Sequence, residues 1–86
     1  MRHAGHQDLV ELTDLLEAIR AHPEIKEPRP GHFYCRGRAL AHFHAEPSGL
    51  YADARMGERW CRLRVSTGRE KGDFLALLEQ EIRSRR

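Results

Sequence analysis

Two histidines one residue apart are the first side chains of this sequence whose types and spacing indicate chemistry. His42 and His44 lie in the segment AHFHAEPSGLYADAR, residues 41–55, which also carries Asp53. Alternate residues of a β-strand point to one face with Cα atoms about 6.5–7 Å apart, and neutral imidazole binds zinc, copper, nickel or iron. His42, His44 and Asp53 are therefore candidate metal ligands, with His32 as another candidate for the third ligand.

The same side chains fit other kinds of site. An aspartate and a histidine on neighbouring strands can work as an acid–base pair, but no serine or cysteine nucleophile is placed beside them. Arginines that alternate with tyrosine and tryptophan suit nucleic acid, but Asp53 opposes Arg62 and the net charge is only +2. We therefore expect neither an enzyme nor a nucleic-acid-binding protein, and the plain alternative is a row of hydrated or interface side chains.

The length of the chain limits what it can build. Eighty-six residues predict a single domain, residues 1–86, with room for one core layer and little room for a deep catalytic cavity. No apolar run approaches the roughly 20 residues of a membrane span, and the first residues contain no apolar signal-peptide core. We expect a cytoplasmic protein without a membrane partner, in which Cys35 and Cys61 are reduced core residues.

An amphipathic helix is predicted near the start of the chain, over residues 8–21. Asp8 is the expected N-cap, leucines follow at steps of three and four, and Pro23 ends the pattern. Residues 23–31 then hold three prolines and a glycine. This composition cannot continue the helix and predicts an extended connector.

A second helix is predicted at the end of the chain, over residues 68–84. Thr67 and Glu70 have the spacing of a capping box, and an apolar stripe of leucine, phenylalanine and isoleucine follows. The tail RSRR is expected to fray, with its positive charge favourable at a helix C-terminus.

Four strand candidates occupy the middle of the chain. Short turn segments separate them, so the sheet is predicted to be an antiparallel meander. The last hairpin supports this arrangement, because a two-residue turn at residues 57–58 pairs apolar side chains on one side and places Asp53 opposite Arg62 on the other. The predicted strands are residues 32–35, 38–44, 50–56 and 60–65.

The facing of the second predicted strand is the least determined part of the sheet. A strict two-residue turn at residues 36–37 pairs Phe33 with Leu40 and turns the two histidines inward. We expect the histidines to face outward instead, because two neighbouring core histidines would each need a buried partner. On that choice His32 and Tyr34 point outward too.

These elements predict the fold class α+β. The order α-β-β-β-β-α gives a two-layer sandwich, in which a four-stranded antiparallel meander carries both helices on one face. The opposite face is left open, and it carries most of the residues that need a functional explanation. We expect the ligand or interface residues to be Tyr34, His42, His44, Tyr51, Asp53, Arg55, Trp60 and Arg62.

An open face rich in aromatic residues and arginine favours association with another protein surface. A second copy packed sheet on sheet would also enlarge a small core, and two-fold dimers are the commonest assemblies. The preferred interpretation is a small interaction module that forms a homodimer or binds another protein through this face. The alternative is binding of a divalent metal or a small anion by the histidine, aspartate and arginine cluster, and no other cofactor is expected.

Part of the sequence resembles a family of small, uncharacterised bacterial proteins. The shared pattern is F-x-x-R-x-R, then H-F-H, then G-L-x-A-D, over about residues 30–67. The resemblance implies a shared site but names no chemistry for it. At the level of fold alone, the order of helices and strands is also similar to that of the MmcQ/YjbR proteins, which are frataxin-like. The residues that carry the pattern are Phe33, Arg36, Arg38, His42, Phe43, His44, Gly49, Leu50, Ala52 and Asp53.

Overall fold

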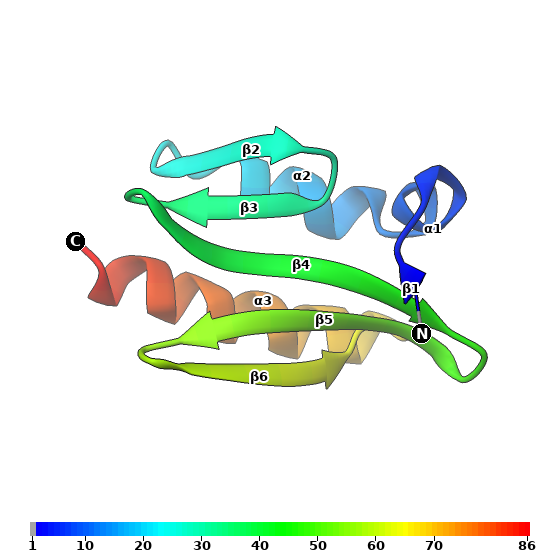
Figure 1. Ribbon diagram of the computed structural model, residues 1–86. Coiled ribbons are helices and arrows are strands. Elements are labelled where there is room, and N and C mark those ends of the chain that lie inside the picture. The colour runs from blue at the N-terminus through cyan, green and yellow to red at the C-terminus, as the bar shows by residue number, and fades with distance from the viewer. Residues whose placement is uncertain (1) are drawn as a thin grey trace.

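Helices and an antiparallel sheet make up the computed structural model, which describes residues 2–86 (Figure 1). The elements are β1 (Arg2–His3), α1 (His6–Glu11), α2 (Thr13–Arg20), β2 (Ile25–Arg29), β3 (His32–Cys35), β4 (Arg38–Glu46), β5 (Gly49–Met56), β6 (Arg59–Arg64) and α3 (Gly68–Ser84). Within these residues the fold is α+β, with strands in the order β2-β3-β4-β5-β6 and the short β1 paired with the far end of β4. Helices α2 and α3 lie on the same face of the sheet (Figure 1).

The observed order of elements differs from the expected α-β-β-β-β-α, chiefly because residues 23–31 are not a plain connector. Ile25–Arg29 form strand β2, which pairs with β3 at the edge of the sheet. Edge strands and bulges tolerate proline, and the pairing is irregular between Lys26 and Arg29, where Pro28 lies. The prolines and the missing alternation of apolar residues concealed this strand in the sequence.

The first helix is divided in two rather than continuous over residues 8–21. α1 begins after Gly5, whose N–H donates to the Asp8 carboxylate at 2.9 Å, so Asp8 serves in the first turn and is not the N-cap. The break falls at Leu12, where the Thr13 hydroxyl donates at 2.6 Å to the carbonyl three residues before it and competes with helical bonding. The apolar stripe is confirmed in α2, whose buried side chains are Leu15, Leu16 and Ile19.

The predicted C-terminal helix is confirmed with its bounds, because α3 runs over Gly68–Ser84. Its capping box forms: the Glu70 N–H donates to Thr67 Oγ1 at 3.1 Å, and the Glu70 carboxylate accepts from the Thr67 N–H at 3.0 Å. The stripe is narrower than expected, since Leu77 is 41% exposed. No helix within residues 2–86 is long and apolar enough to cross a membrane.

Strands β5 and β6 pair in the predicted register, with Asp53 opposite Arg62 and Ala54 opposite Cys61. The apolar side of this hairpin is only partly enclosed, because β6 is the edge strand and no further strand shelters it. Ala54 is buried, whereas Cys61 is exposed. The expectation of a core thiol is therefore wrong for Cys61 and correct for Cys35, which is buried.

The orientation of the histidines depends on a β-bulge between β3 and β4. The turn at Arg36–Gly37 has positive φ angles of 53° and 77°, which two-residue hairpin turns of type I′ require. Farther along, Phe33 pairs with Ala41 and not with Leu40, so Leu40 is an extra residue in β4. Beyond the bulge the two histidines of β4 face away from the helices, as expected, while the turn keeps its strict form.

The core fills the space between the helices and the inner face of the sheet. Phe43 of β4 meets Phe33 and Phe74 edge to face, with ring centroids 6.3 Å and 6.0 Å apart. All three rings are almost completely buried. Such pairs add about 0.5–1.5 kcal/mol to the effect of burial. Because Phe43 anchors β4 from the inner side, its two neighbours in the sequence are held on the outer side.

Candidate functional site

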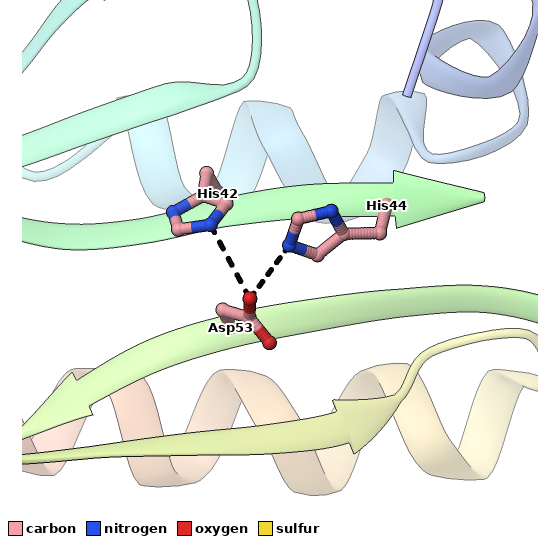
Figure 2. Close-up of side chains that lie close together, drawn as sticks. All are labelled: His42, His44 and Asp53. Atoms are coloured by element: carbon pink, nitrogen blue, oxygen red, sulfur yellow. Dashed lines mark hydrogen bonds and ion pairs between the residues drawn. The ribbon is translucent and has the colours of Figure 1, made fainter. Parts of the chain in front are cut away.

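Asp53 is the centre of a side-chain cluster on the open face, the face of the sheet opposite α2 and α3 (Figure 2). Its Oδ2 lies 2.6 Å from His44 Nε2 and 3.3 Å from His42 Nε2. Arg62 donates from Nε to Oδ1 at 2.7 Å and from Nη2 to Oδ2 at 3.0 Å. One carboxylate thus contacts two imidazoles and one guanidinium.

The register of three strands brings these side chains together. Asp53 of β5 lies directly opposite His42 of β4 on one side and Arg62 of β6 on the other. His44 lies opposite Tyr51, so it is a diagonal neighbour of Asp53. Opposed Cβ atoms are about 4.5–5.5 Å apart and diagonal ones remain within reach of long side chains. The pairing alone therefore brings the four residues of the predicted cluster into contact.

Asp53 is held as an anion. The hydrogen bonds from Arg62 are the largest cause, and with the contact from His44 they lower the pKa of the Asp53 carboxyl from 3.8 to about 2, against the opposing effect of burial. The Asp53 side chain is only 17% exposed. The site therefore offers a negatively charged oxygen, partly shielded from water, throughout the neutral pH range.

The environment of His42 and of His32 favours the neutral imidazole. Burial is the largest cause of the lowered pKa of His42, the imidazoles of His44, His32 and His3 lower it further, and Asp53 opposes them. Burial is also the largest cause of the lowered pKa of His32. His44 is 6% exposed. Neutral imidazole is the form that binds a metal ion, so this environment suits a ligand set.

Two more imidazoles extend the cluster. The His32 ring lies 5.8 Å from the His42 ring, and the His3 ring lies 5.3 Å from that of His44 and 5.6 Å from that of His32, between centroids. Sequence reasoning considered His32 as a ligand but missed His3, because β1 is two residues long and has no periodicity to identify. Within residues 2–86, four histidines from three strands gather beside one carboxylate.

The cluster has the atom types and spacing of a metal site. One ligand atom from each of His42, His44 and Asp53 lies within 4.8 Å of the other two. In a tetrahedral site with bonds of about 2.0–2.1 Å, ligand atoms lie roughly 3.3–3.4 Å apart. The separation of 3.3 Å between His42 and Asp53 already matches, whereas the 2.6 Å between His44 and Asp53 is a hydrogen bond that has to open.

Trp60 and Tyr51, which the sequence also assigned to this face, flank the cluster. The Trp60 ring lies 5.4 Å from the His42 ring and is 48% exposed, so it forms one wall beside the imidazoles. Tyr51 lies opposite His44, but its hydroxyl is hydrogen-bonded to the Ser48 hydroxyl at 2.8 Å. The structure thus brings Trp60 to the cluster and directs the polar end of Tyr51 to the neighbouring turn.

Arg55 and Tyr34, the remaining predicted residues, lie farther from Asp53. Arg55 contacts Glu58 at 3.4 Å, and its buried Nε has no hydrogen-bond partner among the described residues. Tyr34 is exposed and lies opposite Ala39, next to the turn between β3 and β4. Neither residue contacts the Asp53 carboxylate, so both belong to the surface of the open face around the cluster.

Inferences about the function of this chain depend on the side chains of the open face and not on similarity to a known protein. The resemblance of residues 30–67 to a bacterial family stays a prediction, as does the fold-level similarity to the MmcQ/YjbR proteins. No protein-family model, no curated protein and no solved structure matches this chain.

Proposed function

We propose that this protein binds a divalent transition-metal ion through His42, His44 and Asp53. The observation that carries the proposal is the position of Asp53 Oδ2, which lies 2.6 Å from one imidazole nitrogen and 3.3 Å from another. Two neutral nitrogens and one carboxylate oxygen suit Zn(II) and its neighbours among the transition metals. In this proposal the helices form one layer, the sheet forms the second, and the ion lies on the uncovered face of the sheet.

Arg62 both orients the carboxylate and limits the affinity. It donates to Oδ1 of Asp53 at 2.7 Å and to Oδ2 at 3.0 Å, which fixes the rotation of the carboxylate with Oδ2 also directed at the histidines. Hydrogen-bonded partners orient metal ligands in this way in many sites. The positive charge of the guanidinium repels a cation, so we expect weaker binding than in the same site without an arginine.

Removing His42 should weaken metal binding without unfolding the protein. The chain is prepared without a histidine tag, stripped with a chelator, and titrated with Zn(II) while the fluorescence of Trp60, its sole tryptophan, is recorded. Because the Trp60 ring lies 5.4 Å from the His42 ring, a change at the site alters its emission. We expect one ion per chain in the wild type and a loss of about tenfold or more in affinity for His42→Ala.

Matched variants control this titration. His6→Ala removes an exposed histidine of α1, so its zinc affinity should equal that of the wild type. His44→Ala tests the second ligand, and circular dichroism checks that the variant folds, because His44 is buried. Zinc binding that survives both His42→Ala and His44→Ala, or its absence in the wild type, would contradict the proposal.

The second candidate function is association through the open face, the interpretation that the sequence favours. The supporting observation is exposed aromatic surface: Trp60 is 48% exposed and Tyr34 is 41% exposed. Aromatic residues are enriched at protein interfaces. Both cysteines are free thiols, which fits the reducing cytoplasm, where we expect either function to take place.

Trp60→Ala should dissociate a homodimer and leave zinc affinity largely unchanged. Native mass spectrometry at several protein concentrations counts the subunits and any bound metal in the same spectrum. Leu77→Ala is the control, because it removes a comparably exposed apolar side chain, 41% exposed, from α3 in the helix layer. A wild-type chain that is monomeric at every concentration would rule out the homodimer and leave another protein as the partner.

A further inference from the structure

We infer that His32 and His3 supply two further imidazoles to the ion held by His42, His44 and Asp53, which makes the site nitrogen-rich and fastens strand β1 to the sheet. This inference rests on the proposed metal binding and adds two ligands and a structural effect of binding. Its basis is the position of both side chains along one edge of β4.

Strands β1 and β3 occupy successive stretches of the same edge of β4. β5 pairs with β4 from Ala41 to Glu46, so β1, which pairs His3 with His44, has to lie on the other edge. β3 lies on that edge as well, with Phe33 opposite Ala41. Residues 3 and 32 are thereby brought next to each other, although they are far apart in the sequence, and both lie beside the histidines of β4.

The spacing of the four rings resembles that of imidazoles gathered around one ion. With metal–nitrogen bonds of about 2.0–2.1 Å, each ring centre lies about 3.2 Å from the ion, and neighbouring ring centres at the 90–120° angles of a five-ligand site lie about 4.5–5.5 Å apart. The observed centroid distances are 4.8 Å for His42–His44, 5.3 Å for His3–His44, 5.6 Å for His3–His32, 5.8 Å for His32–His42 and 6.1 Å for His3–His42. Rotation about the broad terminal torsion of histidine can turn the nitrogens toward a common point.

The surroundings of the rings are partly shielded from water and carry a negative charge. His44 is buried, and His32 and His42 are partly buried. Asp53 adds a negative charge to the group, which favours a cation over a neutral ligand.

The number of nitrogen ligands decides the class of ion. Mg(II) and Ca(II) prefer sets of oxygen ligands, whereas imidazoles with one carboxylate suit Zn(II), Co(II), Ni(II), Cu(II) or Fe(II). We therefore expect Zn(II) and Co(II) to bind. Mg(II) and Ca(II) should not displace them even at about a hundredfold excess.

Cobalt is the probe for the ligand set, because the position and intensity of its visible absorption depend on the number and type of its ligands. Wild-type protein titrated with Co(II) should give a saturable visible band. His3→Ala and His32→Ala should each change this band and weaken Co(II) binding by about tenfold or more. His6→Ala removes an exposed histidine close to His3 in the sequence and should give the wild-type spectrum.

Hydrogen exchange tests whether the ion fastens β1. The Ala4 N–H donates to the Phe43 carbonyl at 3.0 Å, directly after His3, so its exchange rate reports the detachment of β1 from β4. Zn(II) should slow this exchange in the wild type and have no such effect in His3→Ala. A histidine that only packs against its neighbours would leave the exchange rate independent of zinc in both proteins.

The outcomes separate this inference from the proposed function. If His3→Ala and His32→Ala keep the wild-type cobalt spectrum and affinity, the inference is wrong, and the three-residue site of His42, His44 and Asp53 stands. If the wild type gives no cobalt band and binds no zinc, both are wrong. A changed band in both variants together with zinc-dependent exchange at Ala4 supports the complete set of ligands.

Discussion

Replacing Asp53 with asparagine should lower the free energy of unfolding by about 2 kcal/mol at pH 7 and weaken zinc binding at the same time. Asp53→Asn keeps the size of the side chain but removes the charge that Arg62 and two imidazoles contact. The fold lowers the pKa of this carboxyl from 3.8 to about 2, so the folded protein stabilises the carboxylate more than the unfolded chain does. The asparagine loses this stabilisation and leaves the guanidinium with only the more distant carboxylate of Glu46, 3.9 Å away, as a counter-charge.

The same variant should change the response of the protein to acid. Because the folded-state pKa of Asp53 lies below the ordinary value, its stabilisation is complete above pH 3.8 and is lost as the pH falls towards 2. His42 affects the stability at higher pH than Asp53 does. Its pKa is lowered from 6.5, so the stability that depends on its neutral ring is present above that pH and is lost as the pH falls below it. We expect losses in both pH windows for the wild type and a smaller loss in the lower window for Asp53→Asn.

Urea unfolding at a series of pH values, followed by the fluorescence of Trp60, measures both effects. Asp73→Asn is the matched control, because the Asp73 side chain is 72% exposed and lies 3.9 Å from Arg69. Exposed pairs of this kind contribute little, so its stability should stay within about 0.5 kcal/mol of the wild type. If Asp53→Asn were as stable as the wild type at neutral pH, the pair of Asp53 and Arg62 would contribute no net stabilisation.

The sequence predicts those parts of the site that depend on residues close together in the chain. The register of β5 and β6 follows from a two-residue turn and from the alternation of apolar and polar side chains, so Asp53 could be placed opposite Arg62 without a structure. The bounds of α3 follow from the capping box of Thr67 and Glu70. In both cases the structure preferred by the local sequence is also the one that the whole chain adopts.

Other parts depend on contacts that no local pattern specifies. A strict two-residue turn after β3 would turn the histidines of β4 inward if the two strands paired without interruption. The extra residue at Leu40 shifts the register, so the turn stays strict and the histidines face outward. A bulge of this kind has no signature in the segment RALAHFH. His3 likewise joins the cluster only because the two-residue strand β1 adds to the free edge of β4. The sequence therefore predicts His42, His44 and Asp53 as a candidate site, with His32 as a further candidate, whereas the structure also brings His3 beside them.

Arg85→Ala should lower the free energy of unfolding by about 3 kcal/mol, although the sequence predicted that the tail RSRR frays. The prediction of a frayed end is wrong at Arg85, because its side chain is only 7% exposed. It donates to the Glu81 carboxylate at 2.9 Å, one turn earlier in α3. It also donates, over distances of 3.1–3.2 Å, to the backbone carbonyls of Cys35, Arg38, Ala39 and Arg55.

These bonds join the end of α3 to three strands. Without Arg85 the carbonyls and the Glu81 carboxylate lose their partner in a place that water reaches poorly, and the unsatisfied groups destabilise the fold more than an exposed bond would. Glu81 also accepts from the Gly57 N–H at 3.1 Å, so the turn between β5 and β6 is affected as well. The partner carbonyls lie 30 to 50 residues away in the sequence, which explains why no local pattern indicates them.

Two matched variants distinguish the geometry of Arg85 from its charge. Arg83→Ala removes an exposed arginine from the last turn of α3 and should change the stability by no more than about 0.5 kcal/mol. Arg85→Lys keeps the positive charge but lacks the planar fork of donors, so it should recover only part of the loss. If lysine restored the full stability, charge at the helix C-terminus would be the cause; if Arg85→Ala were fully stable, the tail would be frayed as the sequence predicted. Zinc affinity should be unchanged in all three variants, because the contacts of Arg85 with β4 end at Ala39, before His42.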